Sequence, residues 1–250
     1  MRLTTNEIQR YSRQIILKEL GAQGQFDLVD AKVLVIGTGG LGCPVTQYLA
    51  GAGIGFLDLM DHDTVHRSNL HRQPLFGESD IDRPKVELAA ARANEINPDI
   101  HIGVLNQKAT PESLDIILGG YDVVVDCTDN IKAKYLINDM CIKFGVSLCH
   151  AGVLGFDAQM MTIIPGQSPC LRCVFGDIAD DENLPGCSES GVLGAMVGMI
   201  GSLMAVEAIK LIIGKGRTLS GRLLHINALD LSFRETKVKF NNFCNCQNKA

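Results

Sequence analysis

The chain has 250 residues, of which 46% are hydrophobic and 20% are charged, so it is long enough to bury one large core. A formal net charge of −5 argues against a nucleic-acid surface and leaves a small molecule or another protein as the partner. The polar segment 1–20 lacks the apolar core of a signal peptide, and the nine cysteines do not form a secreted disulfide framework. We therefore expect a cytoplasmic globular protein.

The N-terminal segment is polar and amphipathic. We expect a helix over residues 7–20, inside a helical arm that covers residues 1–30. Arg10 and Arg13 are three residues apart, so a helix places them on one face. Taken alone, such a pair is most often a solvated surface feature.

A glycine-rich motif follows the first predicted strand. Residues 33–36 form a wholly apolar, β-branched run, which is typical of a strand buried on both faces of a parallel sheet. Gly37, Gly39 and Gly42 then complete G-x-G-x-x-G before an expected helix over 44–52. Such a loop lets the backbone approach a phosphate, whose charge the helix N-terminus stabilises. The motif predicts a nucleotide site without identifying the nucleotide.

The alternation of strands and helices continues to residue 165. Asp61 ends the next strand, 56–60, where an acidic side chain meets a ribose hydroxyl in folds of this kind. The elements expected after it are helix 82–94 with Lys85 in its first turn, strand 100–105, helix 112–118, strand 122–126, helix 132–144, and strands 146–149 and 160–164. This order predicts an α/β fold with a Rossmann-like, mixed but mostly parallel sheet and helices on both faces.

The C-terminal third is less regular. We expect a turn-rich loop over 165–173, a polar crossover segment over 176–190, an apolar helix over 191–213, and strands 222–228 and 232–240. The stretch 191–206 is shorter than the ~20 residues that a bilayer needs, so we interpret it as core or subunit interface, not membrane. We assign the whole chain to one domain, with a nucleotide-binding core over 31–165, a cysteine knuckle and crossover loop over 166–190, and a C-terminal part over 191–250.

The cysteines fall into three groups. Cys170 and Cys173 have the spacing of half a structural Cys₄ zinc site, and Cys187 lies in the polar crossover segment without an apolar shell. Near the C-terminus, Cys244 and Cys246 form a C-x-C pair. The remaining cysteines fit core packing; they are Cys43, Cys127, Cys141 and Cys149.

Residues 68–73 read Ser-Asn-Leu-His-Arg-Gln, which resembles the Ser-Asn-Leu-x-Arg-Gln signature of the E1-like activating enzymes of the ThiF/MoeB group. Five further motifs match in the order of the family, at 10–15, 37–42, 82–85, 126–130 and 170–173. These enzymes use ATP and magnesium to adenylate the C-terminal glycine of a ubiquitin-like sulfur-carrier protein that ends in Gly-Gly. The resemblance therefore implies a nucleotidyltransferase with a carrier protein and a sulfur donor as partners.

The resemblance also implies site residues. Arg72 and Lys85 would act on the phosphates, Asp129 would hold magnesium, and Arg13 would reach the site of the neighbouring subunit in a homodimer. The residues implied in nucleotide binding are Gly37, Gly39, Gly40, Gly42, Asp61, Ser68, Asn69, Leu70, His71, Arg72, Lys85, Asp129 and Asn130.

The cysteines have family counterparts as well. In thiamine-type members, a cysteine at the place of Cys187 links covalently to the carrier or its thiocarboxylate, although not every member needs it. The family zinc site has two C-x-x-C pairs, and here the second pair, Cys244 and Cys246, is one residue shorter. We expect all four cysteines to bind zinc nevertheless. Residues 10–15, 65–72, 80–85 and 152–159 favour the thiamine branch over the molybdopterin branch.

Three other functions share parts of this pattern. A nicotinamide-dependent oxidoreductase also begins with G-x-G-x-x-G, but the cations Arg72 and Lys85 and the acid Asp129 suit a triphosphate with a metal. A non-catalytic partner subunit of a heterodimeric activating enzyme would lack the arginine and the aspartate. A tRNA-modifying dehydratase of the same superfamily is disfavoured by the two cysteine pairs.

Overall fold

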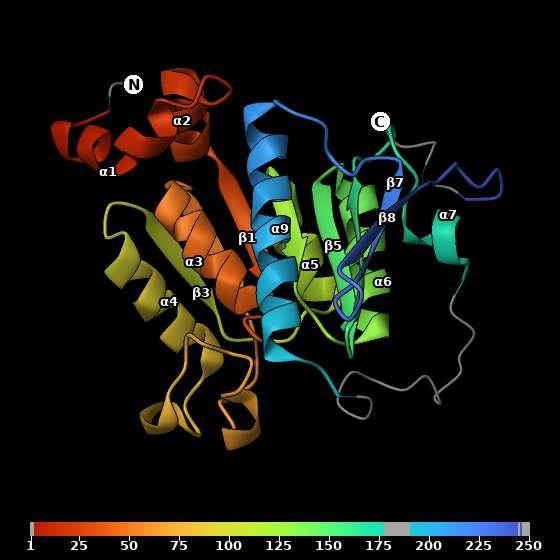
Figure 1. The fold of residues 1–250 in the computed structure, drawn as a ribbon, viewed down its shortest axis with the longest axis horizontal. Coiled ribbons are helices and arrows are strands. Elements are labelled where there is room, and N and C mark those ends of the chain that lie inside the picture. The colour runs from red at the N-terminus through yellow and green to blue at the C-terminus, as the bar shows by residue number, and fades with distance from the viewer. Residues whose placement is uncertain (1–2, 178–190, 245, 247–250) are drawn as a thin grey trace.

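The computed structural model describes residues 3–177, 191–244 and 246. One eight-stranded sheet runs through this part of the chain in the order β3-β2-β1-β4-β5-β6-β7-β8 (Figure 1). The pairings among the first five strands in that order are parallel, and the other three pairings are antiparallel. The expected mixed, mostly parallel α/β sheet is confirmed.

The elements have the following bounds. The strands are β1 (Lys32–Ile36), β2 (Phe56–Met60), β3 (His101–Leu105), β4 (Val123–Asp126), β5 (Ser147–Leu154), β6 (Asp157–Ile163), β7 (Arg222–Asn227) and β8 (Ser232–Lys237). The helices are α1 (Thr5–Ile15), α2 (Gly21–Asp30), α3 (Gly42–Ala52), α4 (Lys85–Ile96), α5 (Pro111–Ile117), α6 (Ile131–Phe144), α7 (Leu171–Phe175) and α9 (Gly194–Ile213). Short 3₁₀ turns lie at Arg67–Asn69, Glu78–Asp80 and Leu118–Gly120.

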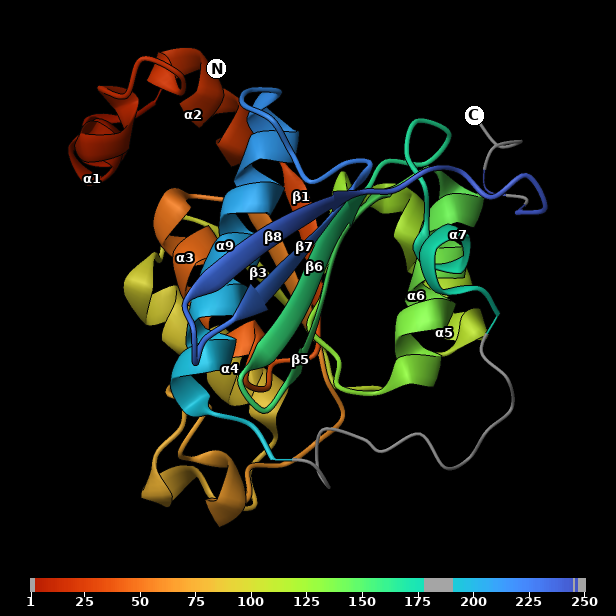
Figure 2. The same cartoon turned by 45° about the vertical axis from the view of Figure 1, so that its right-hand side comes forward.

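Helices cover both faces of the sheet. In β1, Val33 and Val35 belong to one apolar cluster while Leu34 and Ile36 belong to another, because successive strand residues point to opposite faces. The first cluster packs under α3, α4 and α9, and the second under α5 and α6 (Figures 1 and 2). Burial on both faces explains why β1 is an uninterrupted apolar run.

The glycine turn after β1 requires its glycines. Gly37 has φ +93°, a conformation that other residues rarely adopt. A Cβ atom on Gly42 would lie 2.0 Å from the carbonyl oxygen of Gly37. Because no side chain fits there, the backbone folds tightly on itself, and α3 begins at the carboxyl end of β1.

Two expected elements differ from the structure. The single helix over 7–20 is wrong: α1 ends at Ile15, the Leu17 amide turns back to the Gln14 carbonyl at 3.1 Å, and α2 starts separately at Gly21. The turn-rich loop over 165–173 is also partly wrong, because its last residues begin α7 after Cys170. Asn138 stabilises this short helix, since its Oδ1 atom accepts the first amide N–H, from Leu171, at 3.0 Å.

The apolar helix α9 has 20 residues and is long and hydrophobic enough to cross a membrane by length and composition alone. In the structure it packs on α3, where a Cβ atom on Gly201 would lie 2.5 Å from the carbonyl oxygen of Leu41. Its buried Glu207 accepts hydrogen bonds from Thr162 Oγ1 at 2.6 Å and from the Leu219 amide at 2.7 Å. These bonds join α9 to β6 and to the segment before β7, as a core helix requires.

Replacing Gly42 with alanine tests the glycine turn. Because the added Cβ meets backbone, we expect the free energy of unfolding to fall by about 1–3 kcal/mol, the cost of overpacking. Chemical denaturation measures the change. Gly120→Ala is the matched control, since a Cβ atom there meets nothing within 4 Å, and it should stay within about 0.5 kcal/mol of the wild type. Equal stability of the two variants would contradict the assigned constraint.

Candidate functional site

A pocket of about 630 Å³ lies at the carboxyl ends of the parallel strands, where open α/β sheets bind their ligands. It brings together nine of the predicted site residues: Gly37, Gly39, Gly40, Asp61, Asn69, Arg72, Lys85, Asp129 and Asn130. Four others do not line it, namely Gly42, Ser68, Leu70 and His71. Arg13 lies on α1, away from this pocket, and Cys187 lies outside the described residues.

Asp61 organises the glycine loop. Its Oδ2 atom accepts hydrogen bonds from the Thr38 amide at 2.7 Å and from Thr38 Oγ1 at 2.9 Å, while Oδ1 accepts the Asp63 amide at 2.9 Å. Asp61 is buried but still lines the pocket. A carboxylate has more acceptor positions than these three bonds occupy, so Asp61 retains capacity for a ligand hydroxyl.

Two cations enter the pocket from different segments. Lys85 is the first residue of α4 and is only 5% exposed, with its Nζ atom 3.1 Å from Asp63 Oδ2. Arg72 donates from one terminal nitrogen to the Ser68 carbonyl at 2.8 Å, and the same nitrogen lies 2.8 Å from His71 Nε2. Ser68 and His71 therefore contact Arg72 although neither lines the pocket.

Asp129 and Asn130 follow the end of β4. Asn130 is the N-cap of α6, and its Oδ1 atom accepts the Ala133 amide at 3.1 Å. Asp129 is exposed and forms no hydrogen bond or ion pair with any of the described residues. An unpaired carboxylate at the rim of such a pocket has the hard oxygen ligands that Mg²⁺ prefers.

A buried charge cluster behind the pocket was not singled out from the sequence. Asp126 is fully buried, and its Oδ2 atom lies 3.2 Å from Lys134 Nζ and 2.8 Å from His150 Nδ1. Lys134 also donates to the Ala151 carbonyl at 2.7 Å and lines the pocket. The strand register places Asp126 beside His150, and a sequence pattern does not reveal that pairing.

The titration of this cluster follows from its contacts. Burial alone would raise the pKa of Asp126, but the Lys134 ammonium and the His150 and Thr128 donors outweigh burial and lower the pKa well below its ordinary value. Burial lowers the pKa of His150 despite its hydrogen bond to Asp126. We conclude that the cluster contains an ionised Asp126 and a neutral imidazole at neutral pH.

Gln73 lines the pocket but was not predicted as a site residue from the sequence. It is 3% exposed, lines the pocket, and its Oε1 atom has no hydrogen-bond partner. Because an unsatisfied buried amide oxygen is costly, a donor from a bound ligand would stabilise this site. Its position inside the Ser-Asn-Leu-x-Arg-Gln signature was the available signal. Gln73, the glycine loop and the unpaired Asp129 together fit a nucleotide with its metal.

A second constellation consists of four cysteines. Cys170, Cys173, Cys244 and Cys246 have their sulfur atoms within 4.8 Å of one another. The separations are 3.5 Å for Cys170–Cys244, 3.3 Å for Cys173–Cys246 and 4.0 Å for Cys170–Cys173. A tetrahedral site with Zn–S bonds of about 2.3 Å has sulfur atoms about 3.8 Å apart. The donor set and its spacing therefore fit a metal ion despite the short C-x-C pair.

The four-cysteine cluster is joined to the nucleotide pocket through α6. Arg172, between the two cysteines of the knuckle, donates to both carboxylate oxygens of Asp139 at 2.9 and 2.7 Å and stacks over the Tyr135 ring. Asp139 and Tyr135 belong to α6, which also carries Lys134. The remaining four cysteines of the described chain, Cys43, Cys127, Cys141 and Cys149, are buried as expected.

Known proteins resemble this chain over almost its whole length. It is 43% identical to the adenylyltransferase and sulfurtransferase MOCS3 of Drosophila sechellia, over 95% of this chain and 52% of that protein. It is 39% identical to the SAMP-activating enzyme E1 of Haloferax volcanii, over 97% of this chain and 89% of that protein. The chain thus spans about half the length of MOCS3.

Among solved structures, E. coli MccB with MccA-N7isoASN superposes with a TM-score of 0.85 at 22% identity, over 99% of this chain and 76% of that chain. This likeness shows the fold. The model of the ThiF family matches residues 11–248. Because that match covers the arm from residue 11 onward, the pocket and the four-cysteine cluster, this chain belongs to the ThiF family.

Proposed function

We propose that the protein is an ATP-dependent adenylyltransferase that activates the C-terminal glycine of a ubiquitin-like sulfur-carrier protein. The observation that carries this proposal is the pocket, where the glycine loop meets the cations Arg72 and Lys85 and the unpaired Asp129. The relatives named adenylyltransferase and activating enzyme support it. A nicotinamide cofactor would use the glycine loop, but it has no metal-bound triphosphate, which the cations Arg72 and Lys85 and the acid Asp129 suit.

The proposed reaction joins two anions. A carboxylate oxygen of the terminal glycine forms a bond to the α-phosphorus of ATP, and the bond to the leaving pyrophosphate breaks. Arg72 and Lys85 would offset the negative charge that accumulates on the phosphates. Asp129 would hold Mg²⁺, which neutralises the phosphate oxygens when bound. The pocket continues to Gly152 and Val153 of β5, which gives an extended carrier tail a place beside the nucleotide.

We further propose that the protein acts as a homodimer in which Arg13 serves the partner's pocket. Within one chain, α3 separates the glycine loop from the arm: it starts at Gly42 and ends at Ala52, about 15 Å away. Gln14, next to Arg13, donates to the Ala52 carbonyl at 2.8 Å, so Arg13 sits near the far end of this helix. That distance exceeds the length of an arginine side chain, which favours action on a second copy.

The four-cysteine cluster would hold zinc, since four sulfur ligands in tetrahedral spacing are typical of structural zinc. The presence of this cluster disfavours the alternative of a tRNA-modifying dehydratase.

The presence of Arg72 and Asp129 disfavours the alternative of a non-catalytic partner subunit. Cys187 stays a proposed thiol nucleophile. We favour a carrier of the thiamine branch, and a comparison of a thiamine-type with a molybdopterin-type carrier in the adenylation assay tests this preference. We propose a cytoplasmic location, since the reaction uses ATP and the described cysteines are free thiols.

The function is tested by incubating the protein with ATP, Mg²⁺ and a carrier that ends in Gly-Gly, and weighing the carrier for an AMP adduct. The wild type should form the adduct, and Asp129→Ala should lower its rate by about 100-fold or more because the metal loses its anchor. Asp30→Ala, which removes an exposed carboxylate at the end of α2, should leave the rate unchanged. Adduct formation by Asp129→Ala at the wild-type rate would contradict the assigned role.

The trans action of Arg13 is tested by mixing variants. Arg13→Ala and Asp129→Ala should each be inactive, and co-expressed mixed dimers should recover adenylation. The reason is that one of the two sites then has an intact Asp129 and receives an intact Arg13. Inactive mixed dimers, with both chains shown to be present by differential tags, would mean that Arg13 acts within its own chain or not at all.

Removal of one sulfur ligand tests the metal. Cys170→Ser should lose its zinc and several degrees of melting temperature while retaining ATP binding, because metal binding contributes to folding. Cys141→Ala is the matched control: it removes a buried sulfur outside the cluster and should keep the zinc. If the wild type, purified without chelator under reducing conditions, holds less than about a tenth of an equivalent of zinc, the zinc proposal is wrong.

A further inference from the structure

The N-terminal helix α1 projects from the body of the domain (Figure 2). Of its residues Thr5–Ile15, all of them described, Tyr11 alone is buried. The helix starts with a capping box in which the Glu7 amide donates to Thr4 Oγ1 at 3.2 Å and the Thr4 amide donates to Glu7 at 2.7 Å. Because α1 has so little apolar contact with the rest of the chain, a few polar side chains must fix its position.

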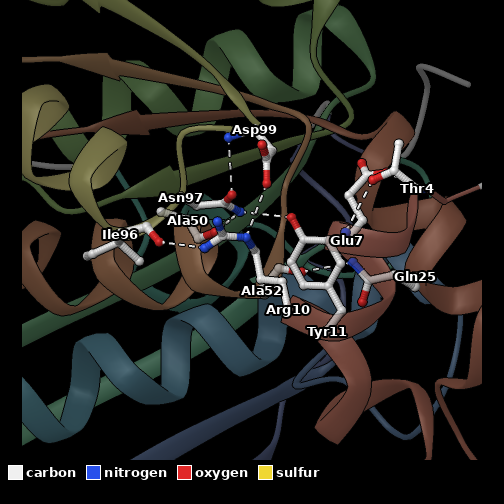
Figure 3. A network of polar contacts seen from close by, with 10 residues as sticks. All are labelled: Thr4, Glu7, Arg10, Tyr11, Gln25, Ala50, Ala52, Ile96, Asn97 and Asp99. Atoms are coloured by element: carbon white, nitrogen blue, oxygen red, sulfur yellow. Dashed lines mark hydrogen bonds and ion pairs between the residues drawn. The ribbon is translucent and has the colours of Figure 1, made fainter.

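Tyr11 inserts between the ends of two helices. Its hydroxyl accepts a hydrogen bond at 2.8 Å from Asn97 Nδ2, which also donates to the Ala50 carbonyl at 2.8 Å (Figure 3). The ring lies against Gly53, where a Cβ atom would come within 2.5 Å of Tyr11 Cζ. Gly53 also has φ +84°, so both its backbone and its neighbour require glycine. The contacts with Gly53 and Asn97 therefore fix the orientation of the Tyr11 ring.

Two more side chains of α1 bind the same helix ends. Arg10 donates from Nε to Asp99 at 3.2 Å and from a terminal nitrogen to the Ile96 carbonyl at 2.9 Å (Figure 3). Gln14 donates to the Ala52 carbonyl at 2.8 Å. These carbonyls belong to the last turns of α3 and α4, which have no partners within their own helices. Arg10 also has the charge that a helix C-terminus favours.

The two helices that receive α1 start at the pocket. α3 begins beside the glycine loop, and α4 begins with Lys85. Because α3 and α4 run from the pocket to the contacts of α1, these contacts fix the position of α1 relative to the pocket of its own chain. Arg13 does not share in the anchoring: it is exposed and has no hydrogen bond or ion pair with any described residue. Apolar side chains of the arm are exposed as well, at 52% for Ile8, 71% for Ile16 and 54% for Leu17.

We propose that Arg10, Tyr11 and Gln14 are positioning residues that hold α1 so that Arg13 enters the pocket of a second copy of this chain. This inference rests on the proposed function of Arg13. The exposed Ile8, Ile16 and Leu17 are the surface that contacts the second copy beside Arg13. Loss of the anchors leaves the pocket of the same chain intact and impairs only the pocket of the partner.

The test uses the full chain with the double substitution Arg10→Ala and Tyr11→Phe, called here the arm variant. Tyr11→Phe keeps the ring and removes the bond to Asn97, so the core stays filled. The loss of these three anchoring bonds should lower the rate of carrier adenylation by about tenfold or more, with the melting temperature within a few degrees of the wild type. Lys143→Ala removes an exposed ion pair with Asp115 on the other face of the sheet, and should leave the rate unchanged.

Mixed dimers separate positioning from a merely structural role. With Asp129→Ala, the arm variant should regain about half of the wild-type rate per dimer, since one of two sites combines an intact Asp129 with an intact arm. With Arg13→Ala, it should regain nothing, because both arms are then defective. If the arm variant fails to recover with Asp129→Ala, its lesion damages its own pocket and the inference is wrong.

One further mixture distinguishes this inference from the proposal beneath it. Suppose that mixed dimers of Arg13→Ala with Asp129→Ala recover adenylation, while mixed dimers of the arm variant with Asp129→Ala do not. Trans action then holds, and the anchoring role is overturned. If neither combination recovers although the wild type forms the AMP adduct, adenylation holds, and both trans action and anchoring are overturned. If mixed dimers of the arm variant with Arg13→Ala recovered adenylation, Arg13 and its anchoring residues would not act from the same arm. That result would also overturn the inference.

Discussion

The close approach of Gly42 to the Gly37 carbonyl is the contact on which the rest of the site depends. With no side chain between them, the backbone reverses immediately after β1 and starts α3 at the carboxyl end of the sheet. The loop residues Gly39, Gly40 and Leu41, just before this helix, then line the pocket. Arg72, Lys85 and Asp129 come from three separate segments, and they converge only because this turn brings the strand ends and the helix start to one edge.

Each of the helices α3 and α4 contributes to the pocket at one end and binds α1 at the other. Their N-terminal ends lie at a pocket suited to anions, where the helix dipole favours negative charge. At their C-terminal ends, Arg10 donates to the Ile96 carbonyl and Gln14 to the Ala52 carbonyl. The complementary polarity of helix ends thus explains both where a nucleotide fits and where the arm attaches.

The parallel core could be predicted from the sequence because its strands are apolar runs between glycine turns and amphipathic helices. The predicted helix over 7–20 is wrong because the chain leaves the helix after Ile15 through turns closed by short-range backbone bonds, which composition does not reveal. The pairing of Asp126 with His150 depends on strand register, which no motif specifies. The approach of Cys244 to the knuckle depends on the path of the tail, and residue spacing alone made that pair look one residue too short.

The charge cluster behind the pocket has a consequence for the electrostatic field inside it. Ionised Asp126 and Lys134 compensate one another, and the neutral His150 adds no charge. With the compensated Lys134 set aside, the charged side chains that line the pocket are four basic and three acidic ones: Arg72, Lys85, Lys108 and Lys132, against Asp61, Asp63 and Asp129. The lining is positive while the whole chain has a formal net charge of −5. A positive cleft in a chain of net negative charge focuses field lines and attracts small anions into it.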